Sequence, residues 1–184
     1  MPNYFRSRVG GGVYFFTVVT YRRRPIFRTN RARVLLRESM DRIGRLRAWE
    51  TVAFVLLPDH FHAIWRLPDG DSDYSWRMGR VKKLFTEGYL AGGGRRGKVT
   101  SGEAAKGYAG IWQPRFWEHT IRNARDFKMH LDYIHLNPVK HGLAQRPRDW
   151  AWSSFQRYVA LGEYEIDWCG RADLPGEVEY FYAD

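Results

Sequence analysis

The sequence predicts an α+β fold in which an antiparallel sheet is covered on one face by helices. Of its 184 residues 44% are apolar, enough to build a buried core. Runs of β-branched and aromatic residues alternate with stretches of helical periodicity, in the order strand, helix, strand, strand, helix, strand, helix. The first six elements are the βαββαβ pattern of a ferredoxin-like sandwich with an antiparallel sheet.

Three strands and one helix are expected in the first half. The run 13–21 predicts a strand that is buried on both faces. Asn30 can cap a helix that extends to about residue 47. Its apolar stripe comprises Leu36, Met40, Ile43 and Leu46. The runs 50–57 and 60–67 predict two more strands. The "PDH" at residues 58–60, where one run gives way to the next, predicts the tight turn of a hairpin.

The second half is expected to add two helices and a strand. Asp and Ser residues can cap a helix over about 74–90, and the glycine-rich segment 91–110 predicts a mobile loop. The run 111–122 predicts the fourth strand. Asn123 can cap a final helix, which Pro138 should end because the residue before a proline avoids the α region.

One folded domain is expected. Residues 1–12 form a basic flexible arm, residues 13–150 the domain that carries the chemistry, and residues 151–184 an aromatic-rich tail with one short helix. Internal repeats are absent from the sequence, and we expect no second domain.

The charge balance favours a polyanionic partner. Thirty Lys and Arg against twenty Asp and Glu leave a net charge of +10, which attracts phosphates and releases their counterions. Candidate contacts are Arg6, Arg8, Arg22, Arg23, Arg24, Lys82, Lys83, Arg95 and Arg96. A surface that is basic only for solubility is the alternative.

The cysteine count and the length of the apolar runs bear on whether the protein lies in the cytoplasm or in a membrane. Cys169 is the only cysteine, so an intrachain disulfide and a cysteine metal cluster are excluded. The apolar stretch "VYFFTVV" is too short to span a bilayer. We therefore expect a cytoplasmic protein without a membrane partner.

Two histidines in the third predicted strand are candidate metal ligands. Successive side chains in a strand point to opposite faces, so His60 and His62 share a face. Imidazoles two residues apart can converge on one cation, and a site with open positions suits Mg²⁺ or Mn²⁺ catalysis. The alternative is a pair of partly exposed histidines that bind nothing.

The last predicted helix carries two stripes. The apolar stripe consists of Phe127, Leu131 and Ile134, and the second stripe of Asp126, His130, Tyr133 and Asn137. An exposed tyrosine beside a metal ligand is a candidate nucleophile towards phosphorus. The alternative is an ordinary amphipathic helix with a polar outer face.

The strings "PDHFHAIW" and "YIHLNPVKHGL" together make the chain resemble the REP-associated tyrosine transposases, single-tyrosine members of the HUH endonuclease superfamily. The resemblance covers about residues 4–160 and includes "RVKKLFT", "FWEHTIR" and "WAWSSFQRY". It implies that His60 and His62 bind a divalent Mg²⁺ or Mn²⁺ and that Tyr133 is the catalytic tyrosine. Asn137 stands where related transposases usually carry glutamine as third ligand, with His135 as a less favoured substitute.

The resemblance also implies an activity: a metal-dependent single-stranded DNA endonuclease and strand transferase that acts at REP-type hairpins of bacterial genomes through a 5′-phosphotyrosine intermediate. His130, one turn before Tyr133, can assist proton removal. Localisation would be cytoplasmic and nucleoid-associated, and the protein a monomer or a homodimer whose tyrosine acts in cis or in trans. The alternatives are a non-catalytic single-stranded nucleic-acid-binding protein and a relic transposase that binds hairpins without cleaving them.

Overall fold

The computed structural model describes residues 9–169. Its strands are β1 (Val13–Val19), β2 (Glu50–Leu56), β3 (His60–Arg66) and β4 (Trp117–Thr120). Its α-helices are α1 (Asn30–Leu46), α2 (Tyr74–Ala91), α3 (Ser101–Ala105), α4 (Ala124–Lys140) and α5 (Phe155–Ala160). Three 3₁₀ turns, η1 (Tyr21–Arg23), η2 (Ile26–Arg28) and η3 (Pro147–Asp149), complete the elements.

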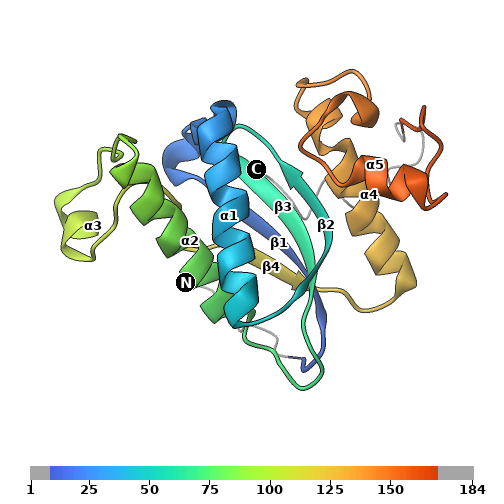
Figure 1. Ribbon diagram of the computed structural model, residues 1–184, viewed down its shortest axis with the longest axis horizontal. Coiled ribbons are helices and arrows are strands. Elements are labelled where there is room, and N and C mark those ends of the chain that lie inside the picture. The colour runs from blue at the N-terminus through green and yellow to red at the C-terminus, as the bar shows by residue number, and fades with distance from the viewer. Residues whose placement is uncertain (1–8, 170–184) are drawn as a thin grey trace.

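The four strands form one antiparallel sheet in the order β2-β3-β1-β4, which confirms the predicted ferredoxin-like βαββαβ arrangement. Helices α1 and α2 pack together on one face of the sheet (Figure 1). The prediction placed helices on that face alone. In the structure α4 covers the opposite face, with α5 beside it (Figure 1).

Successive side chains of the central strands β1 and β3 point to opposite faces of the sheet, and each face has its own hydrophobic core. Phe16 of β1 and Trp65 of β3 belong to the core under α1 and α2. Phe15 and Ile64, on the opposite face of the same strands, pack with residues of α4 such as Ile134. Because His60 and His62 lie in register with Ile64 at spacings of two, the α4 face is the face of the two histidines.

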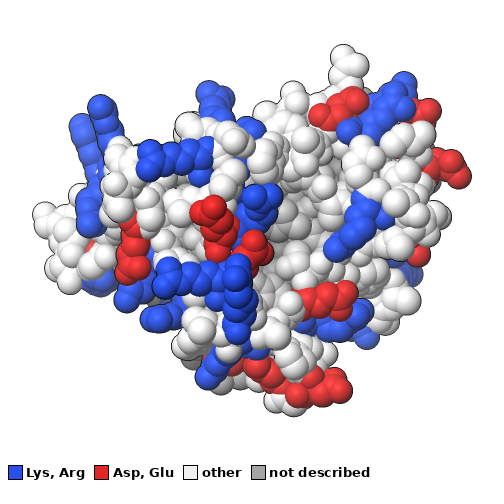
Figure 2. Space-filling view, in the orientation of Figure 1, with Lys and Arg blue, Asp and Glu red and all other residues white. Residues whose placement is uncertain are grey.

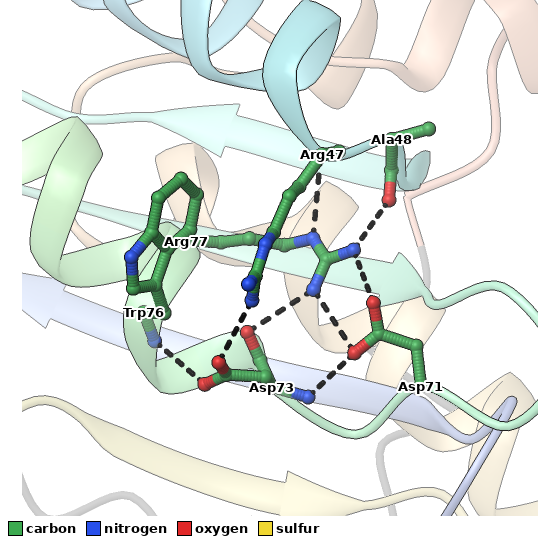
Figure 3. Close-up of polar contacts among 6 residues, drawn as sticks. All are labelled: Arg47, Ala48, Asp71, Asp73, Trp76 and Arg77. Atoms are coloured by element: carbon green, nitrogen blue, oxygen red, sulfur yellow. Dashed lines mark hydrogen bonds and ion pairs between the residues drawn. The ribbon is translucent and has the colours of Figure 1, made fainter.

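A buried arginine joins α1 to α2 (Figure 3). Arg77 is 1% exposed, and its guanidinium donates to both carboxylate oxygens of Asp71, at 3.2 and 2.6 Å. It also donates to the carbonyls of Arg47, Ala48 and Asp73. These hydrogen bonds replace the water that the charge loses on burial, and the pairing with Arg77 lowers the pKa of Asp71. The network thus links the end of α1 to the start of α2.

Several element boundaries differ from the prediction, and the largest difference is in β4, which spans Trp117–Thr120 instead of residues 111–122. Thr29, not Asn30, caps α1 by accepting from the Ala32 N–H. Leu46 is 64% exposed because it lies at the last residue of the helix, beyond the sheet-facing stripe. The first strand ends at Val19 instead of residue 21, since the chain turns into η1.

Pro138 does not end the last helix, contrary to prediction. Helix α4 continues to Lys140, and the chain turns at Gly142, whose φ is +66°. Proline removes the hydrogen bond to the carbonyl four residues earlier, at a cost of about 3 kcal/mol in a helix interior. Burial of the last turn, where Asn137 and Pro138 are both buried, offsets that cost.

The glycine-rich segment 91–110 is partly ordered, which the prediction of a mobile loop did not foresee. It contains α3, which begins with a capping box formed by Thr100 and Glu103. The guanidinium of Arg24 donates to the carbonyls of Arg95 and Gly110, both at 2.8 Å. The segment is therefore attached to the end of β1.

The described part of the tail covers the edge strand β2. The Leu56 N–H donates to the Trp152 carbonyl and the Ser154 N–H to the Phe54 carbonyl, each at 2.8 Å. An edge strand with unsatisfied backbone groups invites pairing with other chains, and this segment satisfies some of them. Within residues 9–169, no helix combines the length and the apolar character that crossing a membrane requires.

Candidate active site and DNA-binding surface

His60 and His62 lie side by side on β3, with ring centroids 4.9 Å apart. Each is oriented by a second group: His60 Nδ1 lies 2.6 Å from Asp59 Oδ1, and His62 Nδ1 lies 2.9 Å from Thr17 Oγ1. A partner at Nδ1 turns Nε2 of each ring towards the site, as is usual for metal-bound histidines. Burial alone would raise the pKa of Asp59, but contacts with His60 and Arg23 lower it.

Tyr133 approaches this pair from α4. Its ring centroid lies 5.1 Å from that of His62 and 5.9 Å from that of Phe15. The side chain is 3% exposed, so the expectation of an exposed tyrosine was wrong, and so was the alternative of an ordinary amphipathic helix with a polar outer face at this position. The second stripe of the helix packs against the sheet, because a helix that covers a sheet buries more than one narrow stripe.

Asn137 lies one turn after Tyr133, on the same side of α4, and is fully buried. Within the described residues, neither amide atom of Asn137 has a hydrogen-bond partner, and the same holds for His60 Nε2. Buried polar atoms nearly always have partners, so these atoms fit a missing ligand. Two imidazole nitrogens and an amide oxygen are ligand types that would suit a divalent ion with open positions.

His141 is a further residue at this site, and sequence reasoning did not single it out. It caps the end of α4, and its ring centroid lies 5.1 Å from that of His60. Lys140 precedes it and places Nζ 5.3 Å from the centroid of the Tyr133 ring. Both belong to the string "NPVKHGL", where only their spacing of seven and eight residues from Tyr133, about two helical turns, could have indicated a shared face.

His135 faces the other way, because residues two apart on a helix point in different directions. Its Nε2 lies 2.9 Å from Ser154 Oγ, and its ring contacts Phe155, Tyr158 and Tyr164. Burial, with smaller contributions from nearby positive charges, lowers the pKa of His135 to about 3. These contacts assign the residue to the packing of the tail on α4.

His130 belongs to a cluster at the start of α4, together with His119 of β4 and Asp126. Burial by itself would raise the pKa of Asp126, but hydrogen bonds from His119 and Arg122 lower it to about 2. Burial also lowers the pKa of His130. The ring of His130 lies 4.8 Å from that of Phe15, which in turn contacts the ring of Tyr133.

The arginines after β1 follow the end of the strand at which Val19 pairs with His60. Arg22 and Arg23 have φ values of +50° and +49°, a left-handed conformation that is rare for residues other than glycine. Arg23 lies 3.3 Å from the Asp59 carboxylate that holds His60. Strained backbone persists where the surrounding structure enforces it, often at functional sites.

A second group of predicted basic residues borders a cavity of about 410 Å³. Its lining includes Lys82, Lys83 and Arg96, together with the aromatic side chains of Tyr108 and Trp112. Lys82 Nζ donates to the Gln113 carbonyl at 2.7 Å, and Lys83 pairs with Glu87. On the face shown in Figure 2, Lys and Arg side chains gather over α1, α2 and the segment around α3. Arg6 and Arg8 lie outside the described residues.

No family model matches the chain, but individual proteins do. It is 44% identical over 170 residues, 92% of each chain, to a REP-associated tyrosine transposase of Escherichia coli. It is 40% identical to a putative REP-associated tyrosine transposase of Haemophilus influenzae, over 95% of this chain and 97% of the relative. A solved REP-associated tyrosine transposase bound to a REP hairpin matches with a TM-score of 0.77 and 42% identity, covering 95% of this chain and 94% of that one. The chain therefore belongs to the family of REP-associated tyrosine transposases.

Proposed function

We propose that the protein is a metal-dependent single-stranded DNA endonuclease and strand transferase that acts at REP-type hairpins through a 5′-phosphotyrosine intermediate. The observation that carries the proposal is the approach of Tyr133 to His62, 5.1 Å between ring centroids, inside one chain. The residues are 71 positions apart in the sequence, and only the packing of α4 on the sheet brings them together. The hairpin follows from the related structure, which holds a REP hairpin.

His60, His62 and the Asn137 amide oxygen are the proposed metal ligands. A divalent ion bound there would polarise the scissile phosphate and offset its developing charge. Asp59 and Thr17 fix the orientation of the two imidazoles. The Asn137 side chain is one methylene shorter than glutamine, but full burial in the last turns of α4 holds it in place.

Tyr133 is the proposed nucleophile. Its phenolic oxygen forms a bond to phosphorus, the bond from phosphorus to the 3′ oxygen breaks, and that oxygen takes up a proton as the phenol loses its own. The positive charge of Lys140 beside the ring favours the phenolate. Since Tyr133 is 3% exposed, its side chain or α4 must move for DNA to reach the oxygen.

The basic side chains would hold the single strand. Arg22, Arg23 and Arg24 border the histidine end of β1 and β3, where a phosphate near the site would meet them. Lys82, Lys83, Arg96 and the aromatic rings of the neighbouring cavity offer phosphate contacts and stacking surfaces for unpaired bases. Arg6, Arg8 and Arg95 are proposed to add further phosphate contacts.

The test is an incubation of the protein with a labelled REP-type hairpin oligonucleotide and Mg²⁺ or Mn²⁺. We expect a covalent protein–DNA adduct that resists denaturation and disappears in Tyr133→Phe. Tyr158→Phe, which alters a tyrosine in the tail packing, is the matched control and should keep the adduct. Hairpin binding with no adduct in any condition would favour a relic transposase, and adduct formation by Tyr133→Phe would exclude Tyr133 as nucleophile.

A further inference from the structure

The start of α4 carries a compact group of metal-binding side chains outside the proposed active site. Asp126 and His130 lie one turn apart on α4, and His119 reaches them from β4. The three potential ligand atoms lie within 4.8 Å of one another. Asp126 and His130 are each 6% exposed, whereas the His119 side chain is 25% exposed and leaves a path for an ion.

Two of the three distances among these atoms are close to the edges of a tetrahedral site, and the third, between the two nitrogens, is at most 4.8 Å. His119 Nε2 and His130 Nδ1 each lie 3.2 Å from Asp126 Oδ1. A tetrahedral ion about 2.0–2.1 Å from each ligand would separate two ligand atoms by about 3.3 Å. The two imidazole rings are stacked, with centroids 4.6 Å apart and an interplanar angle of 14°, so the ring of the more exposed His119 would have to rotate to direct its nitrogen at an ion held by Asp126 and His130.

The other carboxylate oxygen is already held in place. Asp126 Oδ2 accepts from the backbone N–H and from Nε of Arg122, both at 3.0 Å. Such outer hydrogen bonds orient the ligands of metal sites. The Arg122 side chain is 72% exposed, so its guanidinium can move into solvent when a cation arrives. His130 Nδ1 also lies 2.7 Å from the backbone carbonyl oxygen of Asp126, a contact that an ion at this site would replace.

We propose that His119, Asp126 and His130 form a second metal site, which takes a tetrahedral transition-metal ion of the Zn²⁺ class. Two imidazoles and a carboxylate are ligands typical of tetrahedral Zn²⁺ sites, and the carboxylate adds a negative charge that the amide of Asn137 does not have. Water would fill the fourth position at the exposed side of His119. The site shares no residue with the proposed Mg²⁺ or Mn²⁺ site, and its oxygen ligand is the charged carboxylate of Asp126 instead of the neutral amide of Asn137.

The bound ion would attach the first turns of α4 to β4. His130 contacts Phe15, and Phe15 contacts both Tyr133 and His62. An ion at this junction therefore holds the helix that carries the tyrosine near the sheet that carries the histidines. Because an ion that binds only the folded chain stabilises it by mass action, Zn²⁺ should raise the melting temperature.

The test uses the full chain with His60→Ala and His62→Ala, in which the proposed catalytic site is removed. This background is titrated with Zn²⁺ by calorimetry and with Co²⁺ by visible absorption, which reports tetrahedral coordination. We expect one ion per chain and a higher melting temperature. Adding His119→Ala should weaken binding at least tenfold and abolish the shift, whereas Asp132→Asn, which alters a carboxylate elsewhere on α4, should change neither.

Asp126→Asn provides a second variant that preserves the shape of the side chain, and circular dichroism checks that each variant folds. The proposal is overturned if the double variant binds no Zn²⁺ or Co²⁺, or if His119→Ala and Asp126→Asn leave the affinity unchanged. If instead His60 and His62 bind no metal, so that the catalytic proposal fails, the binding experiment gives another result. In that case wild type binds a single ion that His119→Ala removes and that the double variant retains.

Discussion

At the scale of single residues, Asn137 combines full burial with an amide that makes no hydrogen bond within the described part of the chain. Such an amide costs about 1–3 kcal/mol of stability. Asn137→Leu, which keeps the same branching of heavy atoms without the polar groups, should raise the unfolding free energy in the absence of metal by about 1 kcal/mol. The same change should lower metal-dependent cleavage at least tenfold.

Urea unfolding and the adduct assay measure these two effects. Asn137→Asp is the matched control, because it keeps an oxygen ligand and should keep cleavage. Undiminished cleavage by Asn137→Leu would exclude Asn137 as a ligand and direct attention to His141, whose ring also lies near His60.

His135 predicts a dependence of stability on pH. Its pKa is about 3 in the folded protein and about 6.5 when unfolded, so the unfolded chain binds the extra proton. The stability from neutral His135 is thus complete above about pH 6.5 and is lost as pH falls towards 3. Between pH 7 and pH 5 this loss is about 2 kcal/mol.

His135→Gln should therefore show a shallower fall of unfolding free energy between pH 7 and pH 5 than wild type. His130, whose pKa is also lowered by burial, contributes a loss of the same sign in both proteins and cancels in the comparison. Urea unfolding of wild type and His135→Gln at pH 7 and pH 5 measures these free energies. An equal loss in the two proteins would show that His135 does not titrate across this range.

At the scale of elements, Gly142 ends α4 with a φ of +66° and nothing within 4 Å of a built Cβ. The cost of Gly142→Ala therefore comes from the backbone conformation alone and should be about 1 kcal/mol of unfolding free energy. Gly79 lies inside α2, also with nothing within 4 Å. Gly79→Ala is the matched control and should stabilise by about 0.5–1 kcal/mol. Equal effects of the two substitutions in thermal unfolding would contradict this account.

The sequence predicted elements and faces well where local patterns decide them. Alternation in "HFHAIW" indicates which residues share a face, and Asn123 caps α4 as expected. Local rules failed at Pro138, where burial of the final turn outweighs the cost of proline.

The meeting of His62 with Tyr133 could not be derived from spacing, because it depends on where α4 packs on the sheet. The resemblance to a family supplied that expectation. The cluster of His119, Asp126 and His130 had a visible signal in the four-residue spacing of Asp126 and His130. Its third member comes from β4, beyond the reach of helical periodicity.

At the scale of the whole molecule, one chain contains every residue of the proposed active site. Helix α4 packs on the sheet of its own chain, and the ring contacts of Tyr133 with His62 and Phe15 are made within that chain. Three residues, 121–123, connect β4 to α4, and hydrogen bonds from Arg122 and His119 to Asp126 tie this junction together. Such a short, bonded connection favours a tyrosine that acts in cis.

Two inactive variants test this arrangement. Tyr133→Phe lacks the nucleophile, and the double variant His60→Ala, His62→Ala lacks the metal ligands. If the tyrosine acts in cis, mixing the two should restore no cleavage of the hairpin, because each chain still lacks one half of its own site. If subunits exchange α4, one of the two sites in a mixed dimer combines the intact histidines of one chain with the intact tyrosine of the other. Cleavage should then return to a fraction of the wild-type rate. Mass measurement of the mixture with and without DNA shows whether dimers were present to exchange, so that an absence of rescue among dimers establishes action in cis.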